Sequence, residues 1–425
     1  MRNLLPQPRM HWTHEPTGTG DSSLSSSSSA VGLAKADGGE GRGEGVPAVR
    51  FLERRPFRCS VARYIENTYL FSRLAGLACA GFLAMIPFLS GCQTNTASRP
   101  ERANKAWLKS WRAANPTWRG VHLMAHNDQQ VVQLQEALPK LAAVGVNVIV
   151  LEVNYSFDFQ SHPELRPPSG ITRPRAKELA AAARALGIRL IPQLNCLGHQ
   201  SWSRNTSALL TKYPQFDETP GQYPENKGIY CRSWCPQNPD VNRVVFALID
   251  ELADAFDADA FHVGMDEVFL IASEHCPRCR GGDPAKMFAK AVNDLHAHIV
   301  GHRKFEMLMW GDRLLPANTL KYSEWEASKN HTEGALDLIP KDIIMCDWHY
   351  GKQAEYPSVP WFLGKGFRVW PSGWQPLEAT QAFSAYAHSQ KNRNMLGYLC
   401  TTWGKVSVQN AADWPPITEV LPTWK

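Results

Sequence analysis

Eight short apolar runs alternate with helical patterns between residues 119 and 404, and this alternation constrains the fold more than any other feature of the chain. The runs lie at residues 120–126, 146–154, 188–195, 260–265, 305–311, 341–351, 366–373 and 395–404. Continuous apolar strands separated by helices are typical of a parallel sheet that is covered by helices. The pattern therefore predicts the α/β class, and eight such units fit a (β/α)8 TIM barrel that forms a single domain.

A doubly wound open sheet is the alternative architecture for the same alternation. That fold is marked by a Gly-rich phosphate-binding turn after its first strand, and no such turn follows residues 120–126. The barrel is therefore the favoured prediction. In a barrel, the chemistry is expected at the carboxyl ends of the strands.

The first hundred residues differ in composition from the rest. Residues 1–70 contain a serine run and a Gly/Glu/Arg-rich stretch without hydrophobic periodicity, which predicts disorder. Residues 71–92 combine a basic residue, an apolar run and small residues, as a signal peptide does. Their ending, Leu-Ser-Gly-Cys, resembles a bacterial lipobox, so Cys92 is expected to be the lipidated first residue of a mature lipoprotein. Residues 93–116 would be a polar linker that ends in a short helix, and residues 117–425 would form the barrel.

Two alternatives remain for residues 71–92: a transmembrane anchor, for which the apolar run is nearly long enough, and a soluble segment. The lipobox favours a protein of the cell envelope, held by a lipid anchor to the membrane outside the cytoplasm, on the periplasmic or surface side. Because a signal peptide opens a chain, residues 1–70 are alternatively a mis-assigned extension from a start site placed too far upstream.

The charge balance argues against nucleic acid as a partner. The net charge is +5, from 45 basic and 40 acidic side chains, and much of the excess lies before residue 75. No basic stripe runs through the rest of the chain. The chain has 15 Trp residues, which offer flat apolar faces and one N–H donor each. Most are expected in the core, but such faces also suit sugar rings.

Asp266 and Glu267 are adjacent carboxylates at the end of the run 260–265. Successive side chains of a strand point to opposite faces, so the small and polar set, which contains His262, Gly264 and Asp266, is predicted to face the lumen. Two close negative charges resist forming together, which helps to keep one carboxyl protonated, and general acid catalysis requires such a group. A capped helix start is the alternative interpretation of the pair.

Polar or aromatic residues follow the other predicted strands as well, where a barrel would gather them at one rim. They are His126, Asn127, Asn154, Tyr155, Asn195, His199, Trp310, Asp312, Asp347, Trp348, His349, Tyr350, Trp374 and Trp403. The rim is therefore the predicted site.

The stretch AFHVGMDEVF, residues 260–269, resembles the His-x-Gly-Gly-Asp-Glu signature of glycoside hydrolase family 20, the β-N-acetylhexosaminidases. GIRLIPQLNCLGHQSW, residues 187–202, resembles the third strand of that family with its Gly-His motif, and RGVHL, FEMLMWGDRLL and CTTWG resemble its first, fifth and eighth strands. The resemblance covers about residues 117–405. It implies a retaining glycosidase that acts on an oligosaccharide or glycoconjugate and needs no cofactor for catalysis.

The resemblance also implies roles for individual residues. In this family the 2-acetamido oxygen of the sugar attacks C1, an exception to the two-carboxylate scheme. Glu267 would be the general acid and base, Asp266 would orient the acetamido group, and His199 would tune the acid. The acetamido pocket would be walled by Trp310, Trp348 and Trp403.

The chain departs from the family pattern around these residues. Met265 stands where the signature has its second Gly. His126 and Asn127 stand where the first strand usually supplies a sugar-binding Arg. The Tyr that holds the acetamido oxygen has no obvious match, and Tyr350 or Trp374 is expected to take its place. The reaction type is kept by this pattern, but the identity of the sugar is not defined by it.

Seven cysteines follow the lipobox. Cys231 and Cys235 lie in the connection after the third predicted strand, and Cys276 and Cys279 lie in the connection after the fourth. Four thiolates at these spacings predict a structural zinc site, and disulfides or free thiols are the alternatives. No metal is predicted at the catalytic residues.

Two other functions compete with the acetamidohexosaminidase. A two-carboxylate glycosidase would use Asp312, Asp347 or Glu152 as its second carboxylate. A lipoprotein that binds glycans without hydrolysing them is the third hypothesis, which the missing Arg favours and the retained Asp-Glu pair opposes.

Overall fold

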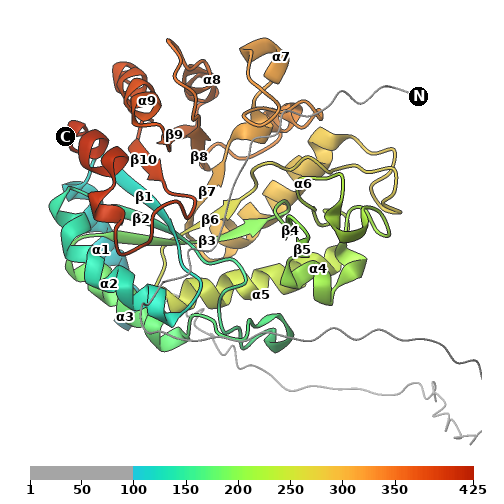
Figure 1. The fold of residues 1–425 in the computed structure, drawn as a ribbon, viewed down its shortest axis with the longest axis horizontal. Helices are drawn as coiled ribbons and strands as arrows, with labels where there is room; N and C mark the ends of the chain where they lie inside the picture. Colours follow the sequence, from blue (N-terminus) through green and yellow to red (C-terminus); the bar gives the residue numbers. More distant parts are fainter. Residues whose placement is uncertain (1–98) are drawn as a thin grey trace, which may run out of the picture. The chain divides into compact units, whose positions relative to one another are not determined.

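The computed structural model describes residues 99–425, so the predictions for residues 1–70 and 71–92, including the lipidation of Cys92, lie outside the described residues. Eight parallel strands of the described part close into a barrel in the order β1-β10-β9-β8-β7-β6-β3-β2 (Figure 1). They are β1 (Trp118–Met124), β2 (Val148–Glu152), β3 (Arg189–Cys196), β6 (Ala260–Gly264), β7 (Glu306–Trp310), β8 (Ile344–Trp348), β9 (Arg368–Gly373) and β10 (Gly397–Thr401). Because β1 pairs with both β2 and β10, the predicted TIM barrel is confirmed and the open sheet was wrong.

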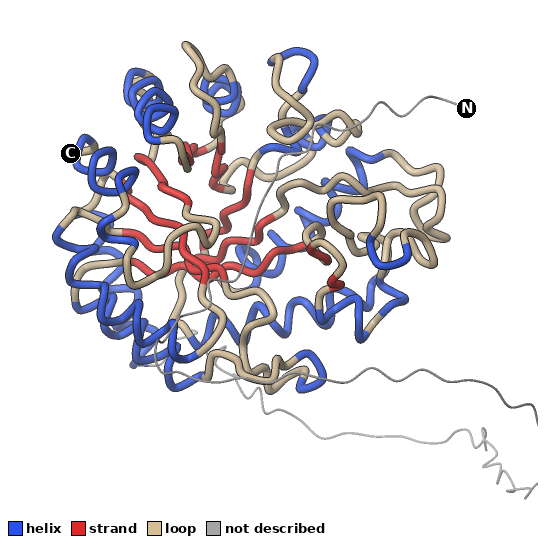
Figure 2. Tube along the Cα trace, viewed as in Figure 1, coloured by secondary structure: helices blue, strands red, loops and turns tan. Residues whose placement is uncertain are grey.

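Helices surround the strands (Figure 2). They are α1 (Arg99–Ala114), α2 (Asp128–Ala143), α3 (Arg173–Ala185), α4 (Ala208–Lys212), α5 (Pro239–Ala255), α6 (Pro284–His296), α7 (Ala317–Leu320), α8 (Ser358–Gly364) and α9 (Leu377–Ser389). The segment predicted as a linker, residues 93–116, thus contains α1, which is longer than the expected short helix. Between residues 99 and 425, no helix is both long and apolar enough to cross a bilayer.

Local sequence signals begin and end the main helices. Asn127 caps α2 by accepting a hydrogen bond from the backbone N–H of Gln130. Asp283 caps α6, and a proline follows it at the first helical position. Gly187, just after α3, has φ 73°, a left-handed conformation that glycine enters without a Cβ clash. These signals set where each helix returns the chain to the barrel.

The barrel separates an inner apolar layer from an outer one. Phe261, Val263 and Met265 belong to the outer core beneath the helices. The ring of His262 instead lies 4.6 Å from that of Trp310, which belongs to the cluster inside the barrel. The predicted alternation along β6 is therefore confirmed, and the polar set of this strand faces the lumen.

The amino-terminal end of the barrel is closed by aromatic rings and buried ion pairs. Trp111 of α1 packs edge-on against Trp118, with ring centroids 5.9 Å apart, and the guanidinium of Arg189 lies over both rings. Arg189 is buried and pairs with Asp259 and Glu306. A buried guanidinium is tolerated where carboxylates compensate its charge, so this end of the barrel serves stability.

Two long connections leave neighbouring strands at the opposite end. Residues 197–238 follow β3 and contain α4 and a hairpin of β4 (Ser201–Trp202) and β5 (Asn205–Thr206). Residues 265–283 lead from β6 to α6. Because β3 and β6 pair directly, both connections start side by side at the carboxyl rim.

Candidate active site

Asp266 and Glu267 directly follow β6, and His199 follows the adjacent β3. Nε2 of His199 lies 3.2 Å from Oδ2 of Asp266 and 3.3 Å from Oε2 of Glu267. Asp266 is only 6% exposed. The structure thus brings together the three residues that the sequence predicts to be catalytic, with one imidazole bridging two carboxylates.

His199 is positioned to carry a positive charge between these carboxylates. Burial disfavours the imidazolium, but Asp266 and the other acidic neighbours together outweigh burial and raise the pKa of His199 well above its usual value. A cation between two carboxylates reduces their mutual repulsion. The imidazolium therefore serves as the counter-ion for the negative charge that remains when one carboxyl of the pair is protonated.

A third carboxylate, that of Asp312, accepts hydrogen bonds from groups next to Asp266 and Glu267. Its Oδ2 accepts hydrogen bonds from the backbone N–H of Glu267 at 2.9 Å and from Nε of Arg313 at 2.7 Å. Its Oδ1 accepts a hydrogen bond from Nε1 of Trp348 at 3.2 Å. Burial raises the pKa of Asp312 to about 6, although Arg313 opposes this shift. Asp312 thereby connects the backbone of Glu267 to a ring that lines the site.

The backbone of the rim is held in the left-handed region. φ is 74° at Met265, 50° at Glu267, 54° at His199 and 46° at Trp403. For a residue with a Cβ atom, such a conformation costs about 1–3 kcal/mol and persists only where the surrounding structure imposes it. Met265 thus keeps the backbone conformation that suits the second Gly of the family 20 signature.

Aromatic side chains pack together inside the rim, where Trp310 is fully buried and Trp348 is 7% exposed. The rings of Trp310 and Trp403 lie 5.3 Å apart, and Tyr350 stacks on Trp348 at 4.9 Å. Nε1 of Trp403 donates a hydrogen bond to the hydroxyl of Tyr350 at 2.6 Å. The structure therefore brings together the three tryptophans of the predicted wall and adds one hydroxyl to it.

The other predicted binding residues lie farther from this surface or are already engaged. Nε1 of Trp374 donates to the carbonyl of Thr402 at 3.2 Å, and its ring lies behind Tyr350 at 5.5 Å. Of the two candidates for the acetamido oxygen, the hydroxyl of Tyr350 is therefore better placed. His126 is exposed, with Nδ1 3.2 Å from Oγ of Ser156, and Asn127 uses its side-chain oxygen to cap α2.

Glu152 and Asp347, two candidates for the second carboxylate of a two-carboxylate glycosidase, are engaged by neighbouring side chains. Glu152 is buried, and its oxygens contact four side chains within the barrel, those of His122, Asn154, Gln193 and Asn195. Asp347 accepts a hydrogen bond from Ser358 at 2.7 Å and pairs with His349 at 3.3 Å. Neither carboxylate is positioned to act on a sugar at the rim.

An aromatic group beside the pair was not predicted from the sequence. Burial and the neighbouring Glu267 carboxylate raise the pKa of the Tyr230 phenol. The ring of Tyr230 packs against Trp202, Phe269 and Trp325 at 5.4, 5.8 and 5.0 Å. Trp202 is 50% exposed. Because these residues lie in the connections between the barrel strands, the periodicity of those strands could not place them, and only the abundance of tryptophan hinted at such a surface.

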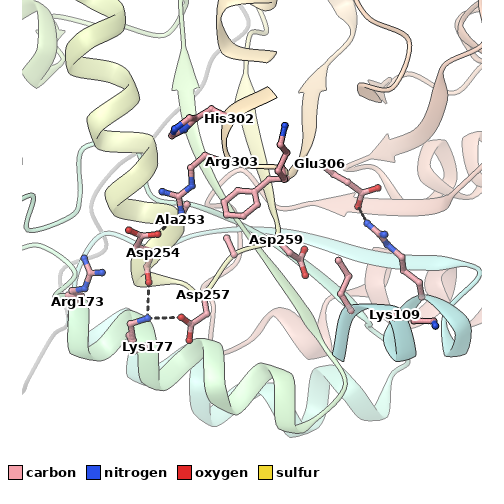
Figure 3. Close-up of a pocket in the computed structure, with 15 residues that line it drawn as sticks. Lys109, Arg173, Lys177, Ala253, Asp254, Asp257, Asp259, His302, Arg303 and Glu306 are labelled. Carbon is pink, nitrogen blue, oxygen red and sulfur yellow. Dashed lines mark hydrogen bonds and ion pairs between the residues drawn. The ribbon is translucent and has the colours of Figure 1, made fainter. Parts of the chain in front are cut away.

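A cavity of about 900 Å³ lies away from this site, beside the residues that lead into β6 and β7 (Figure 3). Several of its charged side chains are already engaged, as where Nζ of Lys177 contacts the carbonyl of Asp254 and the carboxylate of Asp257. None of the predicted site residues lines it. The rim at the carboxyl ends of the strands therefore remains the candidate active site.

Two groups in the described part of the chain have donors close enough to hold a metal ion. One consists of His199, Asp266 and Glu267, and the other consists of Glu218, Cys235, Cys276 and Cys279. The prediction of Cys231 as a fourth ligand was wrong, because its Sγ faces the carbonyl of Glu267 at 3.5 Å. Glu218 occupies the fourth place instead, which cysteine spacing alone could not indicate.

The sequence matches the family model "Glycosyl hydrolase family 20, catalytic domain" over residues 117–414. The chain therefore belongs to glycosyl hydrolase family 20. The family resemblance stated from the rim motifs is confirmed.

Individual relatives are more distant. A β-hexosaminidase of Akkermansia muciniphila is 33% identical over 112 residues, which is 26% of this chain and 22% of that protein. A β-hexosaminidase of Vibrio furnissii is 23% identical over 291 residues, 63% of this chain and 44% of that protein. This chain therefore spans less than half the length of these curated relatives. The crystal structure of a β-N-acetylhexosaminidase from Bacteroides fragilis shares the fold, with a TM-score of 0.52, 14% identity and coverage of 73% of this chain and 66% of that one.

Proposed function

We propose that the protein is a β-N-acetylhexosaminidase, which releases a terminal β-linked N-acetylhexosamine from an oligosaccharide or glycoconjugate with retention of configuration. One observation carries this proposal. Asp266, Glu267 and His199 meet at the carboxyl rim of a family 20 barrel, next to an aromatic wall that could exclude water from an acetamido group.

In the first step, the acetamido oxygen attacks C1 while the bond from C1 to the leaving oxygen breaks. Glu267 gives its proton to that oxygen, and Asp266 holds the acetamido N–H so that the carbonyl oxygen points at C1. In the second step, Glu267 takes a proton from water, the water oxygen attacks C1, and the acetamido group is released. Two inversions at C1 retain the configuration.

The substrate, not a second carboxylate, supplies the nucleophile in this proposal. The engaged state of Glu152 and Asp347 supports this choice. Asp312 is also occupied, since it accepts from Glu267, Arg313 and Trp348. The two curated relatives described above are β-hexosaminidases, which agrees with the proposed activity.

Hydrolysis can be tested with aryl β-N-acetylglucosaminide and aryl β-glucoside. The proposal expects turnover of the acetamido sugar alone, lost in Asp266→Asn and reduced less in Glu267→Gln, because an aryl leaving group needs little protonation. Turnover of the glucoside would instead support a two-carboxylate glycosidase. Binding without turnover of either sugar would support a glycan-binding protein.

The lipid anchor on Cys92 is a separate proposal, which the Leu-Ser-Gly-Cys ending supports. It would hold the enzyme on a membrane outside the cytoplasm. Fractionation of cells that produce the wild-type chain or Cys92→Ala tests it. The wild-type protein is expected in the membrane fraction and the variant in the soluble fraction, and equal distribution of the two would refute the anchor.

A further inference from the structure

Three cysteines and one glutamate from two loops converge in a cluster that the proposed hydrolysis does not use. Glu218 and Cys235 lie in the connection after β3, and Cys276 and Cys279 lie in the connection after β6. Each is at most 1% exposed. One side-chain donor atom from each residue lies within 4.8 Å of the other three. These four residues are called the Cys3Glu cluster below.

The sulfur atoms of the cluster are close but not bonded. Sγ of Cys235 lies 3.3 Å from Sγ of Cys279 and 3.4 Å from Sγ of Cys276. A disulfide would bring two sulfurs to about 2.05 Å, and all three cysteines are free. Around a tetrahedral zinc ion with Zn–S bonds of about 2.3 Å, sulfurs stand about 3.8 Å apart. A small outward movement of the thiols would therefore make room for one ion.

The buried carboxylate of Glu218 also indicates a site for a cation, independently of the sulfur positions. Its Oε1 accepts a hydrogen bond from the backbone N–H of Ser273 at 2.9 Å. Its Oε2 is buried and has no hydrogen-bond partner. An unpartnered carboxylate oxygen is costly to bury, and a cation beside it would remove that cost. The hydrogen bond from Ser273 orients the carboxylate as outer-shell groups orient metal ligands.

We propose that the Cys3Glu cluster is a structural zinc site whose ligands are three thiolates and Oε2 of Glu218. Four protein ligands in a buried position complete a tetrahedral shell and leave no open position for chemistry. Thiolate ligands favour zinc over calcium or magnesium, which prefer oxygen. On binding, the thiols release their protons to solvent.

The ion ties together the two loops that surround the catalytic acid. One loop carries Tyr230, and the other carries Glu267 and Phe269, whose ring packs edge-on against that of Tyr230 at 5.8 Å. A site of four ligands contributed by both loops holds them at a fixed separation. Metal binding can be measured without any glycosidase assay, so failure of the proposed hydrolysis would leave this proposal testable.

Elemental analysis of the full-length chain, purified without chelator, tests the site. About one zinc ion per chain is expected. Cys276→Ser, Cys279→Ser and Glu218→Gln are expected to weaken zinc binding at least about tenfold in competition with a chromogenic chelator. Cys231→Ser is the matched control, because this cysteine lies in the same loop but faces Glu267, and it is expected to keep its zinc.

A second measurement, on the wild-type chain and Cys231→Ser, tests the site even if the ligand variants do not fold. Cobalt exchanged into the wild-type chain should give the thiolate-to-metal absorption of a tetrahedral site, and Cys231→Ser should reproduce it. The proposal is overturned by a wild-type chain without metal, by another metal at one equivalent, or by a mass lower by two hydrogens, which indicates a disulfide. Equal loss of zinc in Cys231→Ser and Cys279→Ser would overturn the ligand set.

Discussion

Asp266 and Glu267 are neighbours in sequence but are held by different partners. Both contact His199, and Glu267 is also anchored through its own backbone N–H to Asp312. Oδ1 of Asp266 is buried and has no partner. An acceptor left free in this way suits a group that must receive an N–H from the substrate.

Because Glu267 is proposed as the general acid and Asp266 as the group that holds the acetamido N–H, substitutions of the two residues should depend differently on the leaving group. A general acid contributes about 10²–10⁴-fold to rate, and this help matters little when the leaving oxygen is already acidic. Glu267→Gln should therefore lose far more kcat/KM on an oligosaccharide than on a nitrophenyl glycoside. Asp266→Asn should lose the same factor on both, because it acts on the acetamido group. Equal losses for Glu267→Gln on the two substrates would contradict the assignment of the acid.

Met265 illustrates a competition between backbone strain and packing. Its φ of 74° favours glycine, yet its side chain is fully buried in the outer core. Losing a buried Met side chain costs about 2–5 kcal/mol, whereas relief of the left-handed backbone returns about 1–2 kcal/mol. Met265→Gly should therefore destabilise the fold by up to about 4 kcal/mol in urea denaturation. Met265→Ala keeps the strain and should be less stable than Met265→Gly, and the opposite order would show that strain is absent.

At the scale of elements, periodicity predicts what the barrel repeats and fails where loops begin. All eight strands were predicted in order, because each is a continuous buried run with its own signal, and parity along β6 correctly turned His262 into the lumen. The path of a loop, in contrast, is not indicated by any periodic pattern in the sequence. Cys231 and Cys235 lie in one loop at zinc-like spacing, but only Cys235 turns toward Cys276. Glu218 reaches the same place from a distant part of that loop, which only the folded chain reveals.

The two loops joined by the Cys3Glu cluster should loosen when the metal is removed. Few secondary-structure hydrogen bonds hold residues 218–235 and 265–283, so local opening there has a low free-energy cost without the ion. Hydrogen exchange of these segments should become faster after chelation and be restored by zinc, while β1 and β9 serve as internal controls. Unchanged exchange in both loops after complete metal removal would speak against this structural role.

The β8 strand and helix α8 are joined by a buried histidine that makes stability depend on pH. His349 contacts Asp347, Glu326 and Ser358 at 3.3, 2.9 and 2.8 Å. Burial opposes its charge, but Asp347 and Glu326 outweigh burial and raise the pKa of His349 to about 9. Since the unfolded pKa is about 6.5, this stabilisation is complete below about pH 6.5 and is lost as the pH rises through about 9.

The shift corresponds to a contribution on the order of 3 kcal/mol from this one group. The free energy of unfolding of the wild type minus that of His349→Gln should therefore fall by about this amount between about pH 6 and pH 10. Urea denaturation at several pH values measures the difference, and the subtraction removes the titration of other groups. A difference that stays constant over this range would show that His349 does not gain its charge on folding.

At the scale of the whole barrel, stability and chemistry are placed at opposite ends of the strands. The amino-terminal end carries Trp111, Trp118 and the compensated charge of Arg189. The carboxyl rim carries strained backbone, like charges and the half-exposed ring of Trp202. A barrel permits this arrangement because the layers of side chains in its lumen support both ends independently.

Two tryptophans test this separation directly. Trp111 is 4% exposed and donates to the carbonyl of Gly187 at 2.8 Å, so Trp111→Ala should cost about 3–5 kcal/mol in stability and leave kcat and KM unchanged where the chain is folded. Trp202 is half exposed beside Tyr230, so Trp202→Ala should change stability by less than about 0.5 kcal/mol. Loss of its stacking surface should raise KM for an oligosaccharide about two- to tenfold, with no change for a nitrophenyl monosaccharide. If Trp111→Ala altered KM at temperatures where the barrel is folded, the amino-terminal end of the barrel and the carboxyl rim would be coupled. The proposed separation of stability from chemistry would then not hold.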